Sequence, residues 1–407
     1  LGVAGAVLYF FLFFFIPLLE AAGIHVGVPN AVPISWETIG ALLLGFAGFV
    51  GGYMALPLMW VRRIPNVFRG AWDSSRGAWV VGGFALLGLI GKILRLAGGG
   101  YFHTERSALF REGVFASVAG YLDLAGVVAL GVALLFYFSL KKEGNPAVWK
   151  FASHSLLALE FSYALFSCGR MATITVVFLY LITRWYAEEF SWKKALLVAI
   201  VAAAFIFPFG NACRNPLFFS NAGVSITSPS SLGAVGRVPA LAGESMVTRL
   251  NQSFVFSHVY GRDLSDFRSD FPRDVLAALG PPSIFWKEKP ISINARGNEL
   301  GHRLSILGPD DRKTSVGPTL PGDFFINFGL LGVFLGMAFF GLLAKFFFAY
   351  LITPLSSLGG ILAYSVLWPV FLHGFEGFIV PLFAGLVKLL ILILVVHFMV
   401  QKRSSFL

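Results

Sequence analysis

The sequence predicts an all-α, polytopic membrane protein with a large, partly helical extracytoplasmic loop. Of its 407 residues, 57% are hydrophobic and 13% are charged, and the charged share is about half that of a soluble domain. Apolar runs long enough to cross a bilayer recur along the chain, and they give about ten transmembrane helices. Short basic loops between these runs provide a consistent topology. Together these observations exclude a soluble multidomain protein.

The first four apolar runs are joined by polar linkers, and two of the loops that follow them are rich in basic residues. They cover residues 1–19, 36–60, 78–97 and 113–140. The second run is followed by Arg62, Arg63 and Arg69, and the fourth by Lys141 and Lys142. Because cytoplasmic loops carry an excess of Lys and Arg, both basic loops are predicted to lie inside.

The later runs continue the same alternation. They cover residues 151–168, 171–183, 195–209, 323–345, 360–371 and 378–400. Lys193 and Lys194 mark an inner loop, and Lys402 and Arg403 follow the last run. The polar stretch between the spans is therefore predicted to lie outside. This gives three regions, with about seven spans in residues 1–209, the loop in 210–322, and about three spans and a short tail in 323–407.

The polar loop contains helical signals in its first part. Met246, Leu250 and Phe254 recur every four residues and predict an amphipathic helix over residues 244–260. A second short helix is predicted over residues 263–279, where Pro272 fits an early helical position. Residues 284–321 are turn-rich. The loop is expected to be a small helical cap on the membrane domain.

Three outer stretches carry the candidate chemistry. Arg170 follows a glycine at the turn between two closely spaced spans. Residues 286–290 read Trp-Lys-Glu-Lys-Pro and precede further basic side chains. Asp323 and Asn327 then lie one turn apart on one face of the next span, and Gly329, Gly332, Gly336 and Gly341 along that span are expected to allow close helix packing.

The order of these features resembles the oligosaccharide repeat-unit polymerases, the Wzy-type or O-antigen polymerase family. The resemblance covers residues 161–341, from the Gly-Arg turn through the Trp-Lys-Glu-Lys-Pro motif to Gly-Asp-Phe-Phe-Ile-Asn-Phe-Gly at residues 322–329. Many relatives carry Glu where this chain has Asp323, which keeps the carboxylate. The resemblance implies the architecture shared with O-antigen ligases and GT-C glycosyltransferases.

The implied reaction is an inverting, metal-independent transfer at the outer leaflet. A growing glycan moves from undecaprenyl diphosphate to the non-reducing end of an incoming undecaprenyl-diphosphate repeat unit. Arg side chains suit the diphosphate because they bind phosphate oxygens bidentately. The substrate-binding candidates are Arg170, Arg214, Arg249, Lys287, Lys289, Arg296, Arg303 and Asn327. The candidates for general base or other catalytic roles are His302, Asp323, Glu299 and Glu376.

The same resemblance implies the surroundings of the reaction. The protein is expected in a bacterial cytoplasmic (inner) membrane, with membrane lipids around it, and with a chain-length regulator and a flippase as further partners. The net charge of +10 comes from basic residues in the short loops, which set the topology, and in the long polar loop, where a lipid phosphate is the expected anion. No nucleic acid is therefore expected as a partner. No cofactor and no metal site are expected. Asp310 and Asp311 are followed directly by Arg312 and Lys313, which neutralise them.

Three alternatives stay open. An O-antigen ligase would use the same donor and a lipid A core as acceptor. A membrane cysteine transpeptidase would use Cys168 beside the outer Arg and His residues. A lipid-linked oligosaccharide transporter would show paired charges along several spans or broken helices at the midplane. Glu160 and Lys388 alone are too few to support a transporter.

Overall fold

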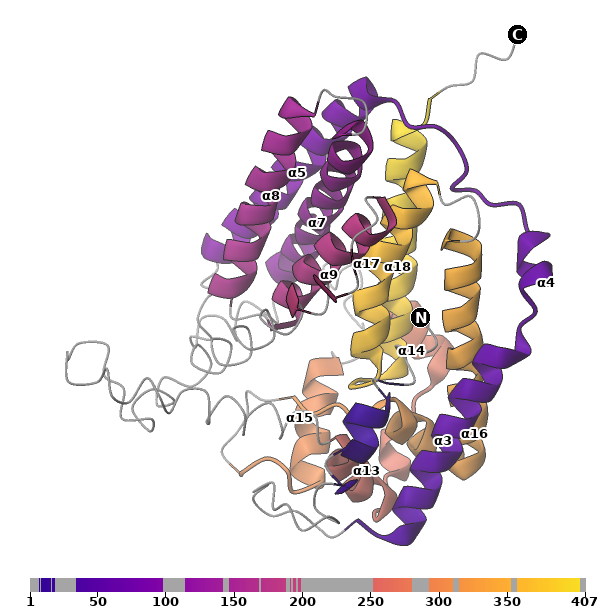
Figure 1. Cartoon of the computed structure of the whole chain (residues 1–407). Helices are drawn as coiled ribbons and strands as arrows, with labels where there is room; N and C mark the ends of the chain where they lie inside the picture. Colours follow the sequence, from indigo (N-terminus) through magenta and orange to yellow (C-terminus); the bar gives the residue numbers. More distant parts are fainter. Residues whose placement is uncertain are drawn as a thin grey trace. The chain divides into compact units, whose positions relative to one another are not determined.

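The computed structural model consists of helices in the part of the chain that it describes (Figure 1). The described ranges are 7, 9–15, 17–18, 34–97, 114–141, 146–167, 170–187, 191, 193–194, 197–198, 252–279, 293–309, 315–352 and 357–402. The chain divides into two compact units. The first comprises residues 1–65, 246–353 and 370–388, and the second residues 66–245, 354–369 and 389–407.

Five described helices are long and apolar enough to cross a membrane. They are α3 (Trp36–Ala55), α5 (Ser74–Ala97), most of α7 (Val114–Lys141), α16 (Leu320–Ile352) and α18 (Ile379–Val400). Two further apolar helices are shorter, namely α9 (Arg170–Ala187) and α17 (Leu358–Gly374). The predicted all-α class is confirmed over the described residues, and the five long apolar helices agree with a membrane protein. The count of about ten spans and the side on which the loop lies remain predictions.

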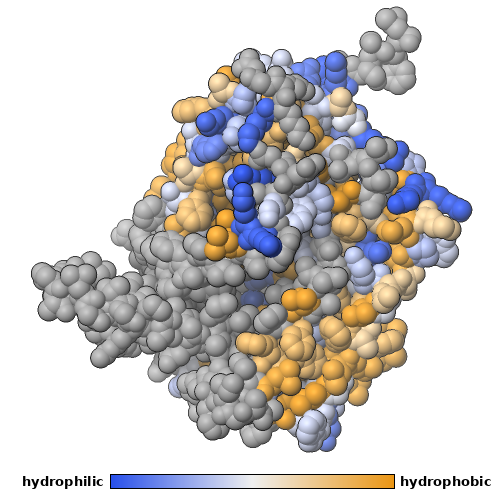
Figure 2. Space-filling view, in the orientation of Figure 1, coloured by the Kyte–Doolittle hydropathy of each residue, from blue (hydrophilic) through white to orange (hydrophobic). Residues whose placement is uncertain are grey.

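The surface agrees with a membrane setting. Large apolar side chains are exposed along α3 and α16, among them Leu43, Met54, Leu331 and Leu335. Figure 2 shows hydrophobic colour over the face that carries these two helices. A soluble protein seldom exposes so continuous an apolar surface, whereas lipid tails cover it without cost.

The second unit is built around four neighbouring helices, α5, α7, α8 (Ala147–Phe166) and α9 (Figure 1). Glycines bring α5 and α7 close together. A Cβ atom on Gly88 would lie 2.5 Å from the Cα of Gly126, and one on Gly91 would lie 2.7 Å from the Cβ of Leu122. Such small-residue contacts are the usual way in which membrane helices approach closely.

The first unit pairs α3 with α16, again through glycines. A Cβ on Gly48 or on Gly52 would collide with backbone carbonyls of α16, and one on Gly341 would collide with the carbonyl of Phe49. The close packing predicted for Gly341 is therefore confirmed. Beyond Ala55, Leu56 and Pro57 interrupt the predicted second span, and α4 (Leu58–Arg62) follows as a separate short helix.

Helix α16 is broken at Gly329. This residue has φ 67° and ψ −158°, which is far from helical geometry. A Cβ on Gly336 would collide with the ring of Phe324, although twelve residues of straight helix would separate the two by about 18 Å along the axis. The segment before Gly329 therefore folds back on the segment after it. The predicted packing role of Gly329 is wrong, because nothing lies within 4 Å of its Cβ position and the residue serves the backbone turn.

The Gly329→Ala variant is expected to be less stable by about 1–3 kcal/mol, because only glycine populates this part of φ/ψ space readily. The expected cost is backbone strain, since the position has open space around it. Thermal unfolding in detergent measures the change. Gly51→Ala is the matched control, because Gly51 also has open space but lies within regular helix α3. A stability loss of equal size in both variants would contradict the assignment.

The described part of the predicted loop forms a cap of short helices. These are α13 (Gln252–Tyr260), the 3₁₀ helix η3 (Ser265–Phe267), α14 (Phe271–Leu279) and α15 (Ile293–Arg303). The cap and the first turns of α16 share one apolar core, formed by Val259, Leu264, Phe267, Leu300, Leu304 and Ile326 with Ile306, Phe325 and Phe378 at its edge. The cap is thus part of the first unit's packing.

The two helices predicted in the loop correspond to α13, described from Gln252 onward, and to α14, which begins at Phe271; residues 244–251 of the first prediction lie outside the described residues. The turn-rich interpretation of residues 284–321 is wrong over Ile293–Arg303, where the chain forms α15. Leu300 and Leu304 lie one turn apart and both are fully buried. Packing of this face outweighs the low helix propensity of Gly297 and Gly301.

Candidate active site

Asp323 lies in the first turn of α16 and joins it to the start of α18. Its side chain is 1% exposed. Oδ2 accepts a hydrogen bond from the backbone N–H of Ile379 at 2.8 Å, and Oδ1 accepts one from Nδ2 of Asn327 at 3.2 Å. Both carboxylate oxygens are therefore engaged inside the protein. This arrangement suits a residue that holds the site in shape.

Asn327 links the same helix start to the cap. Its Nδ2 donates to the carbonyl of Asp323 at 2.8 Å, and its Oδ1 accepts from the backbone N–H of Ser269 at 2.6 Å. The prediction that Asp323 and Asn327 share one face of a helix is confirmed by these contacts. The amide of Asn327 thus fixes the segment after η3 against α16.

Arg296 reaches the same segment from α15. It donates through NH2 to the carbonyls of Phe267 at 3.2 Å and Arg268 at 3.4 Å, and through NH1 to Oδ2 of Asp274 at 3.4 Å. Its side chain is 26% exposed. A guanidinium carries five N–H donors, so the head has capacity for a further acceptor such as a phosphate oxygen. Residues 267–269 therefore bring Arg296 and the start of α16 together.

Arg303 lies two turns further along α15 and contacts the middle residue of η3. Its NH2 is 3.2 Å from Oδ2 of Asp266, and both side chains are more than half exposed. Arg262 donates to the carbonyl of Arg303 and, at 3.3 Å, to Oγ of Ser305. An exposed ion pair contributes about 1 kcal/mol or less to stability. Arg303 can therefore exchange its carboxylate partner for an incoming anion at little cost.

The remaining predicted acid–base residues lie near this region with different exposure. Glu299 is exposed on α15, and His302 is half-buried in the last turn of the same helix. Glu376 is half-buried in the turn between α17 and α18. The backbone N–H of Leu320 donates to the carbonyl of Phe375 at 3.0 Å, which places this turn beside the start of α16.

Several predicted site residues cannot be placed in this geometry. Arg214, Arg249, Lys287 and Lys289 lie outside the described residues. Arg170 begins α9 in the second unit, and its side chain is outside the description. The candidate site is therefore built from Asp323, Asn327, Arg296 and Arg303 with their contacts. Cys168 and the pair Asp310–Asp311 are likewise outside the described part of the chain.

Sequence reasoning missed a second charged cluster, which lies within the second unit. Nζ of Lys92 is 2.8 Å from Oε1 of Glu160 and 3.7 Å from Oδ1 of Asp123. Nε of Arg95 is 3.0 Å from Oδ2 of Asp123, which also accepts from the hydroxyl of Tyr163 at 3.0 Å. Lys92 and Glu160 are almost fully buried. The signal was present, since Lys92 and Asp123 are isolated charges in apolar runs, and such charges mark paired or functional positions.

The sequence also gave no indication of the residues that hold Arg296 in place. Its partners are Asp274 and the carbonyls of residues 267–268, and they belong to the predicted helical cap, where charged residues resemble ordinary surface residues. As for metal binding, the described residues contain no group of three His, Cys, Asp or Glu side chains that could hold an ion. The chemistry that this arrangement offers is anion binding by arginines beside a fixed helix start.

Comparisons with protein-family models, with curated proteins and with solved structures found no match to this chain. Two properties of the chain itself bear on its function, namely the geometry of the site and the order of the motifs in the sequence. The element that joins the two is residues 322–329, which form the Asp323–Asn327 pair and end at the Gly329 break.

Proposed function

We propose that the protein is a membrane glycosyltransferase that polymerises lipid-linked oligosaccharide repeat units. The observation that carries the proposal is the link from Arg296 through residues 267–269 to the Asp323–Asn327 helix start. This link places a guanidinium beside the short segment that precedes the Gly329 break and folds back on the long apolar part of α16. A lipid-linked diphosphate presents its charge at that level, with its polyprenyl tail in the bilayer.

The proposed reaction moves the growing glycan from one undecaprenyl diphosphate to the next. The acceptor sugar hydroxyl attacks the anomeric carbon of the donor, a new C–O bond forms, and the bond from that carbon to the diphosphate oxygen breaks with inversion. The diphosphate leaves with the electron pair. Arg296 and Arg303 stabilise this developing charge, and removing one preorganised donor of this kind typically costs about 10²–10³ in rate.

The acceptor hydroxyl must lose its proton as it attacks. We assign proton removal to His302, which lies on the same helix as both arginines and is half-buried. Glu299 is exposed and Glu376 is half-buried in the same unit, so both remain further candidates for the base. Asp323 holds the start of α16 in position, because both of its oxygens already accept hydrogen bonds from the protein. General base catalysis of this type contributes about 10²–10⁴-fold.

Arg296→Ala and Arg303→Ala are expected to lower the elongation rate by about 10²-fold each, since each removes a phosphate donor. Purified protein is incubated with undecaprenyl-diphosphate repeat units, and the glycan ladder is resolved on a gel. Arg63→Ala is the matched control, because Arg63 is an exposed arginine of the same unit at the end of α4. An unchanged ladder in both site variants would refute the placement of the site.

The same assay separates the proposal from the ligase alternative. A polymerase lengthens glycan on a lipid-linked repeat unit, whereas a ligase transfers it only when a lipid A core is supplied. A ladder from purified protein with repeat units alone supports polymerisation. Transfer that appears only with lipid A core would reassign the activity while keeping the diphosphate site.

A transporter of lipid-linked oligosaccharides is the second candidate, and two observations favour it. The second unit buries paired charges of α5, α7 and α8, and helix α16 is broken at Gly329. A transporter was expected to show paired charges along several spans or helices broken at the midplane, and these two features are of those kinds. Purified protein in vesicles that translocates a lipid-linked oligosaccharide without lengthening it would establish this function. Elongation in detergent, where no leaflet exists to cross, would favour the polymerase.

A further inference from the structure

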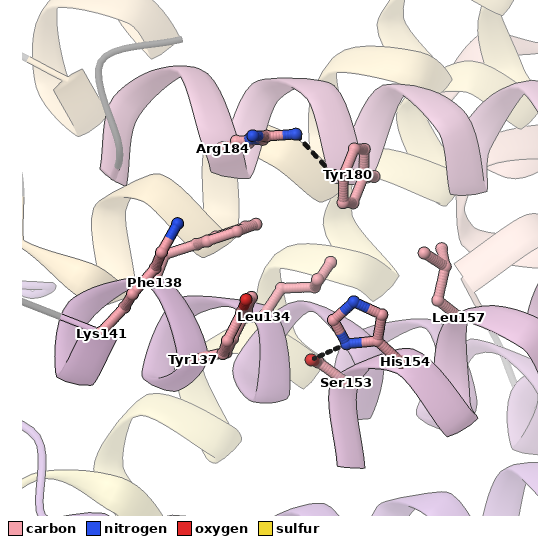
Figure 3. A pocket seen from close by; sticks show the side chains of 9 residues that line it. All are labelled: Leu134, Tyr137, Phe138, Lys141, Ser153, His154, Leu157, Tyr180 and Arg184. Atoms are coloured by element: carbon pink, nitrogen blue, oxygen red, sulfur yellow. Dashed lines mark hydrogen bonds between the residues drawn. The ribbon is translucent and has the colours of Figure 1, made fainter. Parts of the chain in front are cut away.

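A hollow in the second unit lies between the end of α7, the first turns of α8 and the end of α9. Its volume is about 230 Å³, and Figure 3 shows the nine side chains that line it. The polar members are Lys141, Ser153, His154, Tyr137, Tyr180 and Arg184. The remaining walls are apolar. Three helices therefore contribute both polar and apolar side chains to a single cavity.

The lining is positively charged. Lys141 and Arg184 are its basic members, and none of the nine lining residues is acidic. Arg184 donates through NH1 to the hydroxyl of Tyr180 at 2.9 Å, which orients its head on α9 (Figure 3). Nδ1 of His154 contacts the carbonyl of Lys150 at 2.7 Å and Oγ of Ser153 at 3.4 Å. Arg184, oriented in this way, and the nearby Lys141 are side chains that favour an oxyanion.

The cavity lies at the level where a membrane helix meets the headgroups. Lys141 is the last residue of the apolar segment Val118–Lys141, and Arg184 is in the last turn of α9. Trp185 is 41% exposed beside Arg184, as is typical of the aromatic belt at a bilayer interface. Leu134, Phe138 and Leu157 form the apolar walls. A ligand here would meet positive charge at one end and hydrocarbon at the other.

We propose that this cavity binds the phosphate of an anionic membrane phospholipid. The parts of the acyl chains next to the glycerol lie against the apolar walls. A cavity of about 230 Å³ has room for a headgroup and not for a whole lipid, so the chains stay in the bilayer. Basic pockets between membrane helices bind anionic headgroups in this manner. The site is separate from the proposed transfer reaction and does not depend on it.

The test titrates purified protein in detergent with phosphatidylglycerol and counts bound lipid by native mass spectrometry. Wild-type protein is expected to bind one phosphatidylglycerol at this site at least about 10-fold more tightly than phosphatidylcholine, because two cations face one net negative charge. Lys141→Ala and Arg184→Ala are each expected to weaken that binding about 10-fold. Lys150→Ala is the matched control, because Lys150 is an exposed lysine of α8 outside the lining.

Two further measurements keep the proposal falsifiable. Inorganic phosphate at the same concentration is expected not to displace the lipid, and displacement would show a site for free phosphate and overturn the lipid assignment. If either alanine variant unfolds, Lys141→Gln and Arg184→Gln replace it, since they keep the chain length and remove only the charge. Equal lipid affinity in the control and in the charge-neutral variants would overturn the proposal.

Discussion

The Asp323→Ala variant is expected to produce no detectable glycan ladder and to lose about 2–6 kcal/mol of stability. The change removes the acceptor for two buried donors, the backbone N–H of Ile379 and Nδ2 of Asn327. A buried donor left without a partner costs about 1–3 kcal/mol. These bonds join the starts of α16 and α18, so their loss also loosens the start of α16. Arg296 is connected to that helix start through residues 267–269, and its position is therefore expected to change as well.

Denaturant unfolding in detergent and the ladder assay measure the two effects on the same preparation. Asp270→Ala is the matched control, because Asp270 is an exposed carboxylate of the same cap. The Asp323→Asn variant is expected to have a stability between those of the wild type and Asp323→Ala. Its amide keeps one acceptor oxygen, but it turns an NH₂ group toward the second donor. If Asp323→Asn folds like the wild type and yet makes no ladder, the carboxylate takes part in the chemistry and does more than hold position.

The second large effect is expected in the buried charges of α5, α7 and α8. Glu160→Leu is expected to destabilise the protein by about 3–5 kcal/mol, because it removes the nearest partner of a buried ammonium. In the wild type, Nζ of Lys92 lies 2.8 Å from Oε1 of Glu160 and 3.7 Å from Oδ1 of Asp123. Thermal or denaturant unfolding in detergent measures the loss.

The double variant Lys92→Met with Glu160→Leu is the decisive control. Replacing both members of a buried ion pair by apolar side chains is often neutral or stabilising, so the double variant is expected to recover most of the stability. Recovery together with a normal glycan ladder would show that the cluster only joins helices. Recovery of folding with loss of oligosaccharide translocation in vesicles would instead support the transporter function. If the double variant is no more stable than Glu160→Leu, the pair is not coupled as described.

The apolar helices were predictable because a run of about twenty apolar residues, followed by a basic loop, is a signal as long as the helix itself. The predicted run 113–140 and the observed α7 (Val114–Lys141) agree almost residue for residue. The placement of Asp323 and Asn327 on one helix face was also predictable, because residues four apart in a helix lie on the same face. These signals are local in the sequence and need no knowledge of tertiary contacts.

The features that could not be predicted from the sequence depend on contacts between segments that are distant in the chain. Nothing near Asp323 indicates that the backbone of Ile379 donates to it, 56 residues away. The Gly329 break was likewise hidden, because glycines that serve packing and glycines that serve a turn look the same in an apolar run. Helix α15 formed against its turn-rich composition because Leu300 and Leu304 enter a core shared with Ile326.

That shared core limits how the cap can be exchanged or expressed alone. A fragment holding only residues 252–309 would leave Leu300 and Leu304 without Ile326, Phe325 and Phe378, and would carry an exposed apolar face. A chimaera that exchanges the cap would have to transplant the first turns of α16 and the turn before α18 together with it. The cap is thus one part of a discontinuous set of segments that a single small core joins in space.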